Sequence, residues 1–130
     1  MSRQVQISDA EWCVMQVVWD EEPVTAAEVI ASLGETRDWN HRTIRTLLAR
    51  LVEKGALTYD VDGVRYIYRS AVSRGECVRH ESRSFASKVF GGDVQALLTH
   101  FVEDTPLSRE ELQQLRQLLD AKQPTKRKKQ

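Results

Sequence analysis

Apolar residues recur with helical spacing in six stretches of this chain, and two shorter stretches alternate as strands do. The expected helices cover residues 9–19, 26–33, 40–54, 73–90, 94–102 and 109–122. Val24 is expected to supply one short strand, and residues 57–61 and 64–69 to form a hairpin that turns on Asp62 and Gly63. The pattern therefore predicts a mainly α fold with a small β-wing.

Four of the helices begin with the same capping signal, a Ser or Thr followed three residues later by Glu. The pairs are Ser8 with Glu11, Thr25 with Glu28, Ser73 with Glu76, and Ser108 with Glu111. Asp93 is the expected cap of the fifth helix. On the first helix, Cys13 falls on the side opposite to the apolar arc.

Residues 26–54 have the order of a helix-turn-helix. The second helix should end at Gly34 as its C-terminal cap, and a polar turn then leads to Asn40, the expected N-cap of the third helix. Gly55 should end that helix. Its apolar side consists of Ile44, Leu47, Leu48, Leu51 and Val52. A helix of this kind, followed by a hairpin, is typical of a winged helix-turn-helix that presents one helix to the DNA major groove.

The polar side of the third helix carries the residue types that read DNA. Arginine suits guanine edges and phosphates, threonine suits either, and His41 is better placed for a phosphate than for a metal. Arg65, beside the hairpin turn, is expected to reach a phosphate or the minor groove. The predicted DNA contacts are Asn40, His41, Arg42, Thr43, Arg45, Thr46, Arg50 and Arg65. The alternatives are an ordinary solvated helix face and an arginine without a partner.

The chain is expected to have three parts. Residues 1–72 form the winged-helix DNA-binding domain, residues 73–122 a helical dimerisation domain, and residues 123–130 a disordered basic tail. Short amphipathic helices with little core of their own bury their apolar rows by pairing with a second copy, or by packing on the winged domain of the same chain. The predicted dimer residues are Phe85, Val89, Leu97, Leu98, Phe101, Leu112, Leu115 and Leu119.

The distribution of charge along the chain supports DNA binding by one local segment. The 130 residues carry a formal net charge of zero. Residues 37–54 nevertheless contain five basic and two acidic side chains, whereas residues 1–72 contain eight basic and eleven acidic ones. The positive charge is therefore concentrated on one element of an acidic domain.

Composition favours a cytoplasmic protein. The two cysteines, Cys13 and Cys77, do not form a disulfide framework, and the first residues lack the apolar segment of a signal peptide. No stretch approaches the roughly 20 apolar residues of a membrane span. Cys77 and His80 share a helical face, but two ligands do not make a metal site. No catalytic constellation is recognisable, so we expect no enzyme activity and no cofactor or metal.

The order of motifs resembles the penicillinase and methicillin-resistance repressors, the BlaI/MecI type. The resemblance rests on ISDAEWCVMQVVW, PVTAAEVIASL, WNHRTIRTLLARLVEKGALT, ESRSFASKVFGG, ALLTHFVE and LSREELQQLRQLL, and covers almost the whole chain. It implies a homodimeric winged-helix repressor on a palindromic double-stranded DNA operator, with the helices after Ser73 as the dimerisation domain.

The resemblance also implies an off-switch. Repressors of this family are inactivated by a sensor-linked protease, and the matching bond here is His100–Phe101, with His100 standing where better-known members carry Asn. Copper-responsive members carry a Cys-x-Cys motif, which this chain lacks. The alternative functions are a winged-helix protein-interaction module, or a repressor released by a small-molecule or redox signal.

Overall fold

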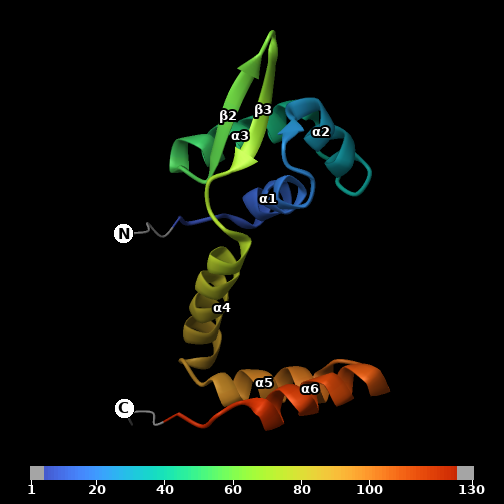
Figure 1. Cartoon of the computed structure of the whole chain (residues 1–130), viewed down its shortest axis with the longest axis vertical. Helices are drawn as coiled ribbons and strands as arrows, with labels where there is room; N and C mark the ends of the chain where they lie inside the picture. The colour runs from blue at the N-terminus through green and yellow to red at the C-terminus, as the bar shows by residue number, and fades with distance from the viewer. Residues whose placement is uncertain (1–4, 126–130) are drawn as a thin grey trace. The chain divides into compact units, whose positions relative to one another are not determined.

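A computed structural model describes residues 5–125 of the protein. The chain divides into two units within one helix, between Ser84 and Phe85. In chain order the elements are α1 (Asp9–Glu21), β1 (Val24–Thr25), α2 (Ala26–Gly34), α3 (His41–Lys54), β2 (Leu57–Asp62), β3 (Arg65–Ser70), α4 (Arg74–Phe90), α5 (Val94–Asp104) and α6 (Arg109–Ala121) (Figure 1). All six helices predicted from the pattern are present. Within residues 5–125, none of them is long and apolar enough to cross a membrane.

Local sequence determines where the helices begin. Ser8, Thr25 and Ser108 each form a complete capping box, in which the hydroxyl accepts a backbone N–H and the glutamate three residues later accepts the N–H of the cap residue. The fourth predicted box is only half formed. The Ser73 hydroxyl accepts the Glu76 N–H at 3.0 Å, but Glu76 accepts from that hydroxyl and not from the Ser73 backbone.

The first unit is built around one apolar core between the first three helices and the sheet. The predicted apolar arc of the first helix and the predicted apolar side of the third face this core. Its most buried members are Val14, Met15, Val18, Val24, Val29, Ile44, Leu48, Leu51 and Leu57. The prediction for Cys13 was wrong, because this residue is half-buried and packs against the core. The reason is that α1 has neighbours on several sides, α2, α3 and β3 among them, so its buried arc is wider than one apolar stripe.

The sheet is antiparallel, in the order β1-β3-β2. Asp62 pairs with Arg65, so the two loop residues are Gly63 and Val64, one position later than predicted. Gly63 adopts a φ of 66° and Val64 does not have a positive φ. A two-residue loop of this kind needs glycine at its first position, which leaves Asp62 paired in the strand. Beyond the core the hairpin projects past α2 and α3 (Figure 1).

The two predicted glycine caps differ. Gly55 has a φ of 88° and ends α3 as expected, with the Ala56 N–H donating to the Leu51 carbonyl at 2.9 Å. The prediction for Gly34 was wrong, because this residue is the last helical residue of α2 and has no positive φ, and the cap is Glu35. The Leu33 carbonyl instead accepts the N–H groups of residues 36 and 37, at 3.2 and 2.7 Å, so the turn closes without a left-handed residue.

The first turns of α4 are anchored on α1. The Trp19 indole N–H donates to the Val72 carbonyl at 3.1 Å, and the Arg74 guanidinium lies over the Trp19 ring and 2.7 Å from Asp20. The residues up to Ser84 therefore belong structurally to the first unit. The functional boundary after residue 72 stays a prediction, and the tail predicted from residue 123 lies mostly outside the described residues.

The second unit has almost no interior. Between residues 85 and 125 Ala86 is the one buried residue. Gly91 and Gly92, both with positive φ, separate α4 from α5, and Asp93 caps α5 by accepting the Ala96 N–H at 3.0 Å. The large apolar side chains that remain exposed are Phe85, Val89, Val94, Leu98, Phe101, Val102, Leu115, Leu118 and Leu119.

Candidate nucleic-acid interface

Helix α3 is held in a defined orientation from its first residue. The Asn40 side-chain oxygen accepts the Thr43 N–H at 2.9 Å and lies 3.3 Å from the Thr43 hydroxyl, so the N-cap is formed as predicted. One turn later Ile44 is fully buried, and Leu48 and Leu51 continue the buried row. The opposite side of the helix is consequently turned to solvent.

An ion pair with a buried carboxylate and a partly exposed lysine fixes the other end of α3, and sequence reasoning missed it. The Lys54 ammonium lies 2.5 Å from Glu11 and 2.7 Å from the Gln6 carbonyl. Burial raises the pKa of Glu11, but the hydrogen bonds from Lys54 and Ser8 outweigh it and bring the pKa below its ordinary value. No signal in the sequence indicated the pair, because the capping box already accounts for a glutamate at this position.

The exposed side of α3 gathers most of the predicted DNA contacts. Arg42, Thr43, Thr46 and Arg50 line a shallow hollow of about 310 Å³ together with Asn40 and Leu47. None of the ion pairs found within residues 5–125 involves Arg42, Arg45 or Arg50. The face therefore presents uncompensated positive charge beside hydroxyl groups, which matches phosphates and base edges.

Three predicted contacts lie outside this hollow. His41 is exposed in the first turn of α3. Arg45 is also exposed on α3, and its charge opposes the increase in pKa that burial causes at the Tyr68 hydroxyl on β3. Arg65 lies at the end of the hairpin, 3.6 Å from Asp62, in a pair so exposed that it contributes little. The structure thus brings five of the eight predicted residues together in the hollow and leaves three around it.

The other candidate residues do not form a site. Cys77 is half-buried against the core, and burial raises the pKa of its thiol, which disfavours the reactive thiolate. Across residues 5–125 no three His, Cys, Asp or Glu side chains are positioned to hold a metal ion.

These elements together define a winged helix-turn-helix protein with a basic recognition helix. The chain belongs to the penicillinase repressor family, whose model matches residues 7–121. Members of this family are transcriptional repressors that bind DNA and are not enzymes, and the same holds for this chain.

Two curated relatives and one solved structure illustrate the match. The chain is 35% identical to the penicillinase repressor of Bacillus licheniformis, over 92% of this chain and 94% of the relative. It is 36% identical to the methicillin resistance regulatory protein MecI of Mammaliicoccus sciuri, over 90% of this chain and 95% of the relative. The solution structure of monomeric B. licheniformis BlaI in complex with the blaP half-operator is 38% identical, with a TM-score of 0.51, over 58% of this chain and 93% of that one.

Proposed function

We propose that the protein is a dimeric, sequence-specific repressor that binds a palindromic operator, with one α3 helix in the major groove of each half-site. The observation that carries this proposal is the uncompensated basic face of α3, in a fold similar to that of a relative solved on a half-operator. A two-fold protein on a two-fold site places its recognition helices about one DNA turn apart, or a multiple of it.

The proposed DNA contacts of α3 differ with the chemistry of each side chain. Arg42 and Arg50 are proposed to contact guanine edges or phosphates, and Thr43 and Thr46 to contact bases or phosphates at closer range. His41 and Arg45 flank this group and suit backbone phosphates, as does Arg65 on the hairpin. Asn40 acts through the helix N-cap, where its side-chain oxygen is already engaged.

The proposed dimer interface lies in the second unit. Phe85, Val89, Leu98, Phe101, Leu115 and Leu119 are exposed there, while Leu97 and Leu112 are half-buried. A unit with one buried residue does not remove enough apolar surface from water to be stable alone, and a second copy supplies the missing surface. This supports the assignment of the predicted residues to a homodimer contact.

Relief of repression is proposed to occur by cleavage at His100–Phe101 by a sensor-linked protease. Both residues lie exposed in α5, and α6 follows them in the chain. A cut here separates the apolar row of α6 from the operator-bound half of the chain. The two DNA-binding units of the dimer are then no longer linked. Binding of one unit to its half-site therefore no longer raises the effective concentration of the other at the second half-site. The two curated relatives are named for penicillinase and methicillin resistance, and we propose a resistance determinant as the controlled gene.

The test of operator binding uses the full chain and a duplex that the chain selects from a randomised pool. Arg42→Ala and Thr46→Ala should each weaken binding by about 1–3 kcal/mol. Arg83→Ala, an exposed arginine on α4, is the matched control and should bind as the wild type does. Selection of no common sequence, or an affinity that is independent of salt, would refute the proposal, since phosphate contacts make binding fall with salt.

Separate measurements test the dimer and the switch. Sedimentation equilibrium of the full chain should give a dimer at micromolar concentration, and Leu115→Glu should shift it to monomer. For the switch, mass spectrometry of the repressor from induced cells should find a fragment that ends at His100. A monomeric wild-type chain at micromolar concentration would contradict the proposed dimer. Intact repressor after induction would contradict the proposed cleavage.

A further inference from the structure

A pair of stacked tyrosines lies on one face of the hairpin. The rings of Tyr59 on β2 and Tyr66 on β3 are 4.4 Å apart between centroids and tilted by 5°, and both residues remain over 40% exposed. Two aromatic rings in this arrangement attract each other beyond the effect of the area that they bury. The wing thus carries an exposed, stacked aromatic surface.

The third tyrosine ties this surface to the recognition helix. Tyr68 follows Tyr66 on the same face of β3 and lies opposite Tyr59 in the hairpin register, with ring centroids 6.5 and 6.0 Å away. Tyr68 is buried in the core and lies within the electrostatic reach of Arg45. The tyrosine face therefore runs from the exposed stack to the core, in which Tyr68 and the buried row of α3 both lie.

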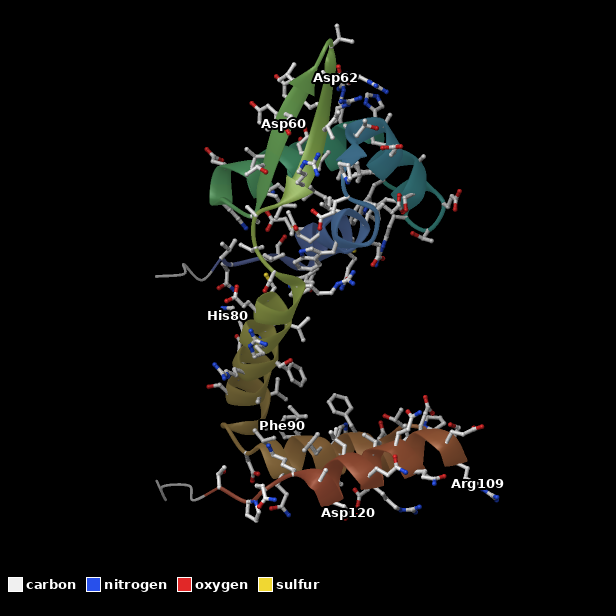
Figure 2. The ribbon with its side chains drawn as sticks, in the orientation of Figure 1. Asp60, Asp62, His80, Phe90, Arg109 and Asp120 are labelled. Atoms are coloured by element: carbon white, nitrogen blue, oxygen red, sulfur yellow. The ribbon has the colours of Figure 1, made fainter. Side chains whose placement is uncertain are left out.

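The opposite face of the hairpin has a different character. Alternation places Asp60 and Asp62 there, at the outer part of the hairpin (Figure 2), together with Arg65 and Arg69. Arg65 lies 3.6 Å from Asp62, and Arg69 lies 3.8 Å from Asp60. A phosphate on this face would meet two carboxylates, whereas the tyrosine face of the two strands, residues 57, 59, 61, 66 and 68, carries no acidic group.

We propose that Tyr59 and Tyr66 bind the DNA backbone beside the major groove. Their phenol hydroxyls donate hydrogen bonds to phosphate oxygens, and the Arg45 guanidinium on α3 contributes a positive charge to the same backbone contact. The inference rests on the proposed function, because it assumes that α3 lies in the major groove. It assigns the principal backbone contact of the wing to the tyrosine face, which sequence reasoning did not include among the DNA contacts. A phenol donates one hydrogen bond and adds no charge, so it holds the backbone without displacing a counterion.

The test compares Tyr59→Phe and Tyr66→Phe with the wild-type full chain on the selected duplex. Each substitution keeps the stack and removes one hydroxyl, and should weaken binding about tenfold, the effect of a hydrogen bond to a charged group. The slope of affinity against salt should not change. Thr58→Val removes a hydroxyl from the opposite face of the same strand and should have no effect on affinity. Thermal unfolding midpoints of the variants establish that they are folded.

A second readout does not depend on substitution. The chain contains three tyrosines, all in the hairpin, so a 3-fluorotyrosine-labelled protein gives three ¹⁹F resonances. The resonances of Tyr59 and Tyr66 should shift when the duplex is added, with a smaller change at the buried Tyr68. Wild-type affinity of both Phe variants, or unchanged resonances in the complex, would overturn the inference. Failure of the wild type to bind any duplex would instead contradict the proposed function.

Discussion

Glu11→Gln should destabilise the winged unit, although the substitution preserves the size of the side chain and an oxygen for the capping box. Glu11 is 1% exposed and accepts hydrogen bonds from the Ser8 N–H at 2.9 Å and from Lys54 at 2.5 Å. An amide still accepts both, but it no longer neutralises the Lys54 ammonium. The substitution therefore weakens the contact that holds the C-terminal end of α3 against α1.

The expected magnitude follows from the exposure of the two partners. Breaking a fully buried ion pair by removal of one partner costs about 3–5 kcal/mol. The Lys54 side chain is 35% exposed and keeps its hydrogen bond to the Gln6 carbonyl at 2.7 Å, so solvent and backbone compensate part of the loss. We therefore expect a decrease in the free energy of unfolding of about 2 kcal/mol. This corresponds to a decrease of about 1 M in the urea midpoint.

Urea unfolding followed by tryptophan fluorescence measures this change. All three tryptophans, Trp12, Trp19 and Trp39, lie in the first unit, so the signal reports on that unit. Glu28→Gln is the matched control, because Glu28 occupies the same position in the Thr25 capping box but is exposed and has no lysine partner. Its midpoint should stay close to that of the wild type.

The destabilisation caused by Glu11→Gln should also depend on pH. The pKa of Glu11 is lower in the folded chain than the ordinary value of about 4.3, so its contribution to stability is present above that value and is lost as the pH falls through the folded pKa. The difference between wild type and Glu11→Gln should therefore persist from neutral pH down to about 4.3 and decrease as the pH falls further through the folded pKa. Equal midpoints for wild type, Glu11→Gln and Glu28→Gln at neutral pH would refute this account of the ion pair.

Three further substitutions test other parts of the first unit. Gly55→Ala places a side chain at a φ of 88° and should lower the free energy of unfolding by about 1 kcal/mol, measured by urea unfolding; an unchanged midpoint would contradict the left-handed cap. Asn40→Asp keeps the cap on the Thr43 N–H and should leave the thermal midpoint unchanged or higher. The new negative charge should nevertheless weaken operator binding by repulsion of the phosphates. Wild-type affinity of this variant would exclude Asn40 from the interface. Trp19→Phe removes the hydrogen bond to the Val72 carbonyl and should increase amide exchange at the start of α4, measured by hydrogen exchange; unchanged exchange there would show that the bond does not anchor the helix.

Much of the fold and of the candidate site was predictable from the sequence because the relevant interactions are local. The recognition helix illustrates this. Its N-cap at Asn40, its buried row from Ile44 to Leu51 and its left-handed Gly55 depend on residues within a few positions of each other. The polar residues of α3 were then placed on one face by helical periodicity alone.

The errors concern positions where a distant part of the chain intervenes. Cys13 was assigned to the outer side of the first helix, but packing around α1 makes that side half-buried. The hairpin turns at Gly63 and Val64, because the strand register continues to Asp62 and Arg65. Gly34 is not a left-handed cap, because the Leu33 carbonyl accepts the backbone N–H groups of residues 36 and 37.

By itself the sequence determined the elements, the starts of the helices, the basic face of α3 and the family of the protein, since each depends on short-range periodicity or on motif order. The tertiary structure decided what lies on each side of those elements. It paired Glu11 with Lys54 across 43 positions of the chain, stacked Tyr59 on Tyr66, and left the apolar rows of the second unit without a cover. The physical reason is that burial and pairing depend on which distant surfaces meet, and local periodicity specifies a face but not its partner.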